Sequence, residues 1–356
     1  MKNLGTLFGE FELKHFDSVT TTEAEYQASN AFVNVMAAES EPELPPRSLE
    51  YTVQELKSLE FTKTSDIGLY SVWKAEEVVA SLYTDVSLQE DNPHLMSADI
   101  KILPAYRRQG IATVLLETLL EVATKHGRRL AIFNTDERVP SGAAFAKALG
   151  ADAASQGQEN QLVLEELPDG LTQRWIGEAD TKASDYTLGI WEGAFPEAEI
   201  ESIAVLMEVM NTAPKDDLEM EDWCVTPEML REDEDFMNKQ NGSRWVYYAR
   251  HEATGEYAGY TEMYFEPDTP ETAWQGDTGV VPEHRGHAIG RWLKASMLEK
   301  IQRERPEITR VRTGNADSNA PMLAINHALG FKPYKAWTDW QVSMDQITAY
   351  LKAKRE

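Results

Sequence analysis

Two segments of this 356-residue chain repeat one another at a constant spacing, and this repeat limits the folds open to the chain. Residues 99–112 read DIKILPAYRRQGIA and residues 277–290 read DTGVVPEHRGHAIG, so that Arg107 aligns with Arg285. The offset of 178 is half the length of the chain, and Ala-Leu-Gly recurs further on at an offset of 180, as 148–150 and 328–330. An ordered series of matches at this spacing indicates the tandem duplication of a whole domain.

The sequence around each repeat copy alternates between strand-like and helix-like patterns. Upstream lie short runs rich in β-branched and aromatic residues, typical of hairpins: 67–73 and 78–83 in the first half, 245–249 and 257–265 in the second. Downstream, apolar residues recur at helical spacing over 111–123 and 289–301. A further strand and a short helix follow in each half. The helix is expected to end at Gly150 or Gly330, because glycine readily adopts the left-handed conformation of a helix cap. Each half is therefore expected to be an α/β domain with a mixed sheet and helices packed against it.

Length and composition support two domains. The turn-rich stretch 167–171 predicts a first domain at 1–168, a linker at 169–185 and a second domain at 186–356. The single cysteine, Cys224, excludes an intramolecular disulfide framework and is expected to be a small buried hydrophobe. With no cysteine cluster and only seven histidines, we expect no metal.

The chain is strongly acidic, with a formal net charge of −26. Such a charge repels nucleic acid and anionic lipid and favours cationic partners. No signal peptide is apparent at the start of the sequence, and no run approaches the roughly 20 apolar residues of a membrane span. We therefore expect no nucleic-acid partner, no membrane association and a cytoplasmic location.

The repeated loop has the composition of an anion site. It lies between a predicted strand and a predicted helix, whose first amides lack internal partners and attract negative charge. Small residues let a pyrophosphate approach the backbone, and an arginine adds a charge-assisted contact. Neither copy has the Gly-Lys-Ser/Thr of a nucleoside triphosphate loop or the Gly-x-Gly-x-x-Gly of a dinucleotide fold. The candidate phosphate-binding residues are Arg107, Arg108, Gln109, Gly110, Ile111 and Ala112, and Arg285, Gly286, His287, Ala288, Ile289 and Gly290.

The pattern Arg-x-x-Gly/Ala-x-Gly/Ala in this context resembles the coenzyme A loop of the GNAT acyltransferase superfamily, once in each half. The resemblance implies two tandem GNAT-like acyl-CoA N-acyltransferase domains that use acetyl-CoA as co-substrate. It also implies that a backbone amide at the end of the preceding strand polarises the thioester carbonyl. By resemblance, those strand ends are Ile102 and Leu103 in the first half and Val280 and Val281 in the second, and the cofactor arm is contacted by Asn315 and Asn319.

The candidate catalytic groups lie in the second half. An attacking amine must lose a proton, and Asp277 on the strand before the loop or Glu262 on its neighbour is the expected base or amine-orienting group. The alternative is a structural bond, because Asp99 recurs at the position of Asp277. Members of the family often carry a tyrosine four residues before the final glycine as general acid, but here that position holds Ala146 or Asn326. The acid is then another residue, such as Tyr334, or water.

These features predict a catalytic second domain and a first domain that is vestigial, structural or regulatory, because residues 136–140 lack an asparagine equivalent to Asn315. The expected activity is acetyl transfer from acetyl-CoA to a primary amine of a small cationic acceptor by direct attack. Two alternatives stay open: a non-enzymatic coenzyme A-binding protein, and an acetyltransferase for a protein amine. The sequence determines neither the acceptor nor the oligomeric state.

Overall fold

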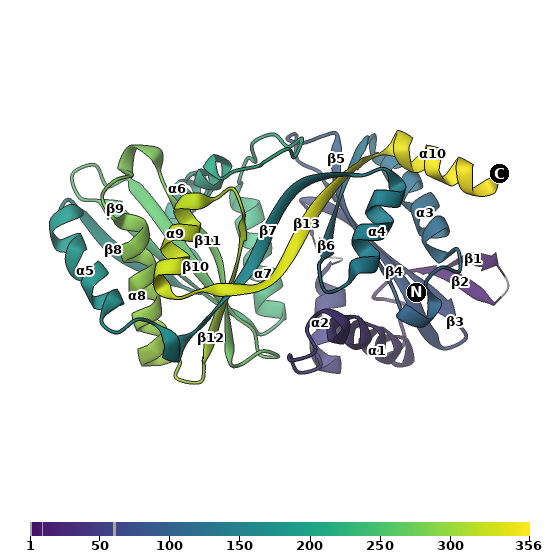
Figure 1. Cartoon of the computed structure of the whole chain (residues 1–356), viewed down its shortest axis with the longest axis horizontal. Coiled ribbons are helices and arrows are strands. Elements are labelled where there is room, and N and C mark those ends of the chain that lie inside the picture. Colours follow the sequence, from purple (N-terminus) through teal and green to yellow (C-terminus); the bar gives the residue numbers. More distant parts are fainter. Residues whose placement is uncertain (1, 9, 60–61) are drawn as a thin grey trace. The chain divides into compact units, whose positions relative to one another are not determined.

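A computed structural model describes residues 2–8, 10–59 and 62–356 of the chain (Figure 1). It divides into two compact units, which are not two consecutive stretches of sequence. Unit 1 contains the residues up to Gln156 together with Asp216–Glu221 and Trp337–Glu356; unit 2 contains Gly157–Lys215 and Asp222–Ala336. The predicted ranges 1–168 and 186–356 follow these units only in part, because each half contributes its last strand to the other unit.

In unit 1 the sheet order is β1-β2-β3-β4-β5-β6-β13, and among its described residues β5 and β6 form the only parallel pair. The strands are β1 (Lys2–Phe8), β2 (Phe11–His15), β3 (Ser65–Lys74), β4 (Glu77–Ser87), β5 (Leu95–Ile102), β6 (Leu130–Asp136) and the end of β13 (Lys332–Ser343). The helices are α1 (Glu23–Ser40), α2 (Leu49–Leu59), η1 (Pro104–Tyr106), α3 (Ile111–His126), α4 (Pro140–Leu149) and α10 (Met344–Arg355).

In unit 2 the order is β8-β9-β10-β11-β12-β7, and only β11 and β12 pair in parallel. The strands are β7 (Asp152–Val163), β8 (Tyr186–Glu192), β9 (Ser243–His251), β10 (Tyr257–Phe265), β11 (Thr272–Val280) and β12 (Arg310–Ala316). The helices are η2 (Leu164–Glu166), α5 (Leu171–Lys182), η3 (Glu197–Glu199), α6 (Ile200–Met207), η4 (Glu208–Thr212), α7 (Pro227–Lys239), η5 (Pro282–His284), α8 (Ile289–Glu304) and α9 (Ala320–Leu329).

The strand exchange is visible in the pairing registers. Residues 157–163 of β7 pair with β12 inside unit 2, and residues 337–343 of β13 pair with β6 inside unit 1. In both units, the exchanged strand completes the sheet beside the strand that follows the long loop helix.

The helical periodicity predicted from sequence corresponds to the buried faces of α3 and α8. The buried apolar residues are Ile111, Leu115, Leu116, Leu119 and Ala123 in unit 1, and Ile289, Leu293, Met297 and Ile301 in unit 2. Both α4 and α9 end at a glycine in the left-handed conformation, Gly150 and Gly330, as predicted. The mixed α/β class is thereby confirmed. The prediction for Cys224 was wrong, because the cysteine lies exposed in a segment without regular secondary structure between η4 and α7.

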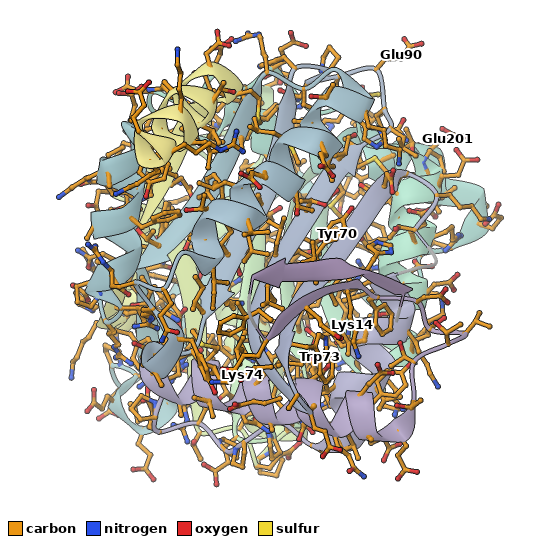
Figure 2. The ribbon with its side chains drawn as sticks, turned by 90° about the vertical axis from the view of Figure 1, so that its right-hand side faces the viewer. Lys14, Tyr70, Trp73, Lys74, Glu90 and Glu201 are labelled. Carbon is orange, nitrogen blue, oxygen red and sulfur yellow. The ribbon has the colours of Figure 1, made fainter. Side chains whose placement is uncertain are left out.

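At the first strands of unit 1 a lysine joins the sheet to α1. Figure 2 shows Lys14 and Trp73 side by side on the paired strands β2 and β3, and Lys14 Nζ lies 4.4 Å from the ring centroid of Trp73. The same ammonium is 3.1 Å from Glu25 Oε1 on α1. The contact combines cation–π attraction with an ion pair.

Among the described residues, none of the helices has the length and apolar character needed to cross a membrane.

Candidate active site

The loop before α8 has the backbone shape of an anion site. Gly286 and Ala288 both adopt positive φ angles, 88° and 61°, which turn successive peptide units towards one side. A Cβ atom built on Gly286 would meet nothing within 4 Å, so the loop surface is open. No side chain caps the N-terminus of α8, which leaves the first amides of the helix available to a ligand's phosphate. This geometry suits the binding of an anionic group such as a phosphate.

The first copy has the same backbone shape but a different charge. Arg108 and Gly110 adopt the matching positive φ angles. Arg107 Nη1 donates to Glu39 Oε1 of α1 at 2.7 Å, and its Nη2 donates to the other carboxylate oxygen. This bidentate pair neutralises the guanidinium, and both side chains are half-buried.

Arg285 of the second copy has a neutral partner in place of that carboxylate. Its Nη2 donates to Thr212 Oγ1 of η4 at 2.6 Å, while its Nε donates to Val280 O at 2.9 Å. Arg107 Nε makes the equivalent bond to Ile102 O at 3.0 Å, so both arginines are anchored to the strand end. Of the two aligned arginines, Arg107 is therefore paired with a carboxylate, whereas Arg285 is held by neutral oxygen atoms.

The end of β11 separates from β12 just before this loop. The two strands pair only over residues 272–274 and 310–312. Val281 N–H donates to Ala258 O at 2.9 Å, which makes Val280 and Gly259 a pair without mutual hydrogen bonds. The Val280 N–H consequently points away from β10, towards the side where β12 has diverged.

Unit 1 repeats this arrangement at the equivalent strand end. Leu103 N–H donates to Val79 O at 3.0 Å, and β5 pairs with β6 only over residues 95–97 and 130–132. Of the four strand-end residues predicted to serve a thioester, Val281 and Leu103 have amides occupied by the neighbouring strand, while Val280 and Ile102 lie at the diverging side.

A β-bulge in β11 brings two predicted catalytic residues together. Thr261 faces Thr278 and Met263 faces Gln275, so two residues of β11 oppose the single residue Glu262 of β10. Those two residues are Gly276 and Asp277. The corresponding strands of unit 1, β4 and β5, pair without interruption, from residue 80 opposite residue 102 to residue 85 opposite residue 97. Bulges of this kind redirect side chains next to functional sites.

Glu262 and Asp277 form a pair of neighbouring acidic residues. Glu262 is buried, and its Oε1 accepts a hydrogen bond of 3.0 Å from the Asp277 backbone N–H. Burial, followed by the charge of Asp277, raises the pKa of Glu262 to about 7. Asp277 is the more exposed of the two, and desolvation by the surrounding protein raises its pKa as well. The pair can therefore take up a proton near neutral pH.

Further carboxyl groups surround this face of the sheet. Arg244 of β9 faces Tyr264 of β10, two residues along from Glu262, and its Nη2 lies 3.6 Å from Glu234 Oε1 of α7. The neighbouring Asp233 has a pKa raised by burial. The charge of Arg244 lowers the pKa of Glu262, but burial and the charge of Asp277 raise this pKa by more. Glu234 also accepts a 2.6 Å hydrogen bond from Arg231 Nη1, so its charge is neutralised by the two arginines.

The structure places the other predicted residues as follows. Asn319 is the N-cap of α9, and its side chain accepts a 3.4 Å hydrogen bond from Met322 N–H. Asn315 Oδ1 accepts from Asn326 Nδ2 at 2.7 Å. His287 Nδ1 lies 3.1 Å from Lys182 O. The Tyr334 ring stacks on Arg312, with the guanidinium carbon 3.8 Å from the ring centroid.

Sequence reasoning missed a buried lysine, Lys294 of α8, which is 1% exposed. The repeat contained a signal for it: at the offset of 178, Lys294 aligns with Leu116, an apolar core residue.

Comparisons with known proteins agree with this geometry. The model described as the acetyltransferase (GNAT) family matches residues 33–151 and 206–331. A tandem GNAT protein from the clavulanic acid biosynthesis pathway, solved without AcCoA, is 26% identical over 94% of this chain and 99% of its own, with a TM-score of 0.73. A GCN5-related N-acetyltransferase from Sphaerobacter thermophilus is 14% identical over 95% and 97%, with a TM-score of 0.60. No curated protein matches the chain.

The family model matches each repeat copy, and the tandem GNAT structure aligns with nearly the whole chain. This protein therefore belongs to the GNAT family of acetyltransferases, as a tandem member with two copies of the GNAT fold.

Proposed function

We propose that unit 2 transfers an acetyl group from acetyl-CoA to a primary amine of a small cationic acceptor. The observation that carries this proposal is the Glu262–Asp277 pair, which lies on β10 and β11 immediately before the strand end and the open phosphate loop. Acetyl-CoA, when bound, supplies an activated acetyl thioester. We assign its pyrophosphate to the amides of residues 286–290 and to Arg285.

The chain's own residues supply the remaining chemistry. Glu262 as carboxylate accepts the proton that the ammonium group must lose before its nitrogen can attack, directly or through water. The Val280 N–H donates to the carbonyl oxygen as negative charge develops there. The carbon–nitrogen bond forms while the carbon–sulfur bond breaks, and the thiolate leaves with a proton from Tyr334 or water.

A cationic acceptor is supported by the exposed carboxyl group of Asp277 beside the base and by the acidic net charge of the chain. For unit 1 we propose a structural or regulatory role. Its Arg107 is neutralised by Glu39, and the strand register puts Tyr83 at the position of Glu262. These differences support a single catalytic unit.

The test combines binding and turnover. Coenzyme A is titrated calorimetrically into the full chain and into the Arg107→Glu and Arg285→Glu variants, and we expect only Arg285→Glu to lose binding. Thiol release from acetyl-CoA is then followed with four kinds of acceptor: a polyamine, an aminoglycoside, a primary amine that carries no other charged group, and lysine-bearing peptides. Release with the small cations supports the proposal. Release with peptides alone indicates a protein acceptor, and uptake of coenzyme A without release from any amine indicates a non-enzymatic binder.

A further inference from the structure

The buried lysine of α8 holds two side-chain amides on neighbouring elements. Lys294 Nζ donates to Gln275 Oε1 of β11 at 2.9 Å and to Asn326 Oδ1 of α9 at 2.8 Å. Asn326 is fully buried, and Gln275 is 7% exposed. Both partners are neutral, so they do not compensate the charge of an ammonium group.

Each amide passes the hydrogen bond on towards the candidate site. Asn326 Nδ2 donates to Asn315 Oδ1 at 2.7 Å. Gln275 Nε2 donates to Thr261 Oγ1 at 2.7 Å and to Thr278 Oγ1 at 3.2 Å, and Thr278 directly follows Asp277.

The lysine also sets the direction of these bonds. Lys294 Nζ is the donor in both bonds, so Gln275 and Asn326 turn their oxygens to Lys294 and their N–H groups outwards. Asn315 must then turn its oxygen towards Asn326, which leaves its own Nδ2 as a donor on the other side. Asn315 is half-buried on β12, where the strand has diverged from β11.

Unit 1 fills the same positions with hydrocarbon. At the repeat offsets, Lys294 corresponds to Leu116 and Asn326 to Ala146. The strand registers match Gln275, Thr261 and Thr278 with the following residues of unit 1: Ala98, Leu82 and Ile100. Four of the five are no more than 5% exposed, and Ile100 packs against the same core. The GNAT fold therefore does not need a polar network here, and burying one is unfavourable unless it serves the site.

We infer that Lys294 is a positioning residue of the acetyl-transfer site, which orients Asn315 towards the cofactor arm and Thr278 beside Asp277 through a one-directional hydrogen-bond relay. The inference rests on the proposed function. Burial lowers the pKa of Lys294 to about 7, and both the ammonium and the neutral amine carry the two N–H donors that these bonds need.

The relay can be cut without removing the lysine. An Asn326→Asp substitution keeps an oxygen for Lys294 but has no N–H for Asn315, so the direction of the last bond is lost. We expect this variant to keep the melting temperature of the wild type and to bind coenzyme A about tenfold more weakly, as befits one lost hydrogen bond. Asn315→Ala should weaken binding equally, and the double variant no further. Lys294→Met should lower affinity, while the matched Leu116→Met in unit 1 should not.

Calorimetric titration of coenzyme A into the full chain decides between the outcomes. Wild-type affinity in Asn326→Asp or in Asn315→Ala overturns the inference, as do additive losses in the double variant, since either means that the residues act independently. If Lys294→Met does not fold, the asparagine variants carry the test alone. Failure of the wild type to take up coenzyme A has a different meaning, because it overturns the proposed function itself.

Discussion

Glu262 Oε1 accepts a 3.0 Å hydrogen bond from the backbone N–H of Asp277, although the two residues lie on different strands. The bulge in β11 makes this contact possible, because two residues there face the one residue Glu262. A peptide N–H stabilises the charged form of Glu262, whereas burial and the Asp277 carboxylate oppose it more strongly. The balance leaves a carboxyl group that changes its charge near neutral pH.

The first prediction concerns the pH dependence of turnover. A base must be unprotonated to act, so kcat/KM for an amine acceptor should rise with pH and level off above the Glu262 pKa of about 7. Glu262→Gln should lower kcat by about 10²–10⁴-fold and remove this inflection, with coenzyme A affinity retained. Rates measured from pH 5.5 to 9 check this, and an unchanged inflection in Glu262→Gln would contradict it.

The second prediction separates Asp277 from Glu262. The charge of Asp277 raises the pKa of Glu262, so Asp277→Asn should move the inflection of the pH profile to lower pH. If Asp277 also orients a cationic acceptor, KM for that acceptor rises while KM for acetyl-CoA stays constant. A profile that superimposes on that of the wild type would show that the two carboxyl groups do not interact in the working enzyme.

The third prediction uses the space beside Glu262. A Cβ atom on Gly276 would lie 2.6 Å from Glu262 Oε1 and 2.8 Å from Tyr264 Cε2. Because both side chains are packed against buried neighbours, Gly276→Ala should displace the Glu262 carboxylate and reduce kcat at least tenfold. Gly286→Ala is not a suitable control, since its φ of 88° strains any other residue. Gly177→Ala on α5, where a Cβ meets nothing within 4 Å, should keep full activity.

The fourth prediction tests the difference between the two arginines. Arg285→Ala should weaken coenzyme A binding about 10- to 100-fold, because it removes a charge-assisted contact. Arg107→Ala should leave the affinity unchanged but lower the melting temperature slightly, because it removes the bidentate partner of the half-buried Glu39 carboxylate. Titration and calorimetry of both variants measure the two effects. Equal losses of affinity would mean that unit 1 also holds coenzyme A.

Local sequence patterns predicted the strands and helices next to each loop, but not α5, which lies within the stretch 169–185 that was predicted as a linker. The apolar spacing of Ile289, Leu293 and Met297 matches the buried face of α8, and Gly330 caps α9 as a left-handed glycine should. The repeated pattern of an arginine followed by small residues also located the two loops, 107–112 and 285–290, whose backbones adopt positive φ angles.

The remaining features depend on partners that are distant in sequence. Glu39 lies 68 residues from Arg107, and the bulge opposite Glu262 arises from a single additional residue in β11. The exchange of β7 and β13 could not be predicted from the sequence either. Both strands follow the same kind of helix, and either sheet offers each of them a similar edge. Composition alone does not choose between such edges.

The fifth prediction concerns the stability of unit 2 and needs no substrate. Burial lowers the pKa of Lys294 to about 7, whereas an unfolded lysine titrates near 10.4. Between these two pKa values the lysine is protonated in the unfolded chain and neutral in the folded protein. The free energy of unfolding therefore rises as the pH increases from about 7 to about 10, and this lysine causes no pH dependence below about 7. The wild type should therefore gain stability relative to Lys294→Met with rising pH, by up to about 1.4 kcal/mol per pH unit. Calorimetric melting temperatures at pH 7, 8.5 and 10 give this difference, with Leu116→Met as a control that keeps the wild-type pH dependence. Parallel curves for wild type and Lys294→Met would mean that Lys294 keeps an ordinary pKa and that its surroundings are wetter than the side-chain packing indicates.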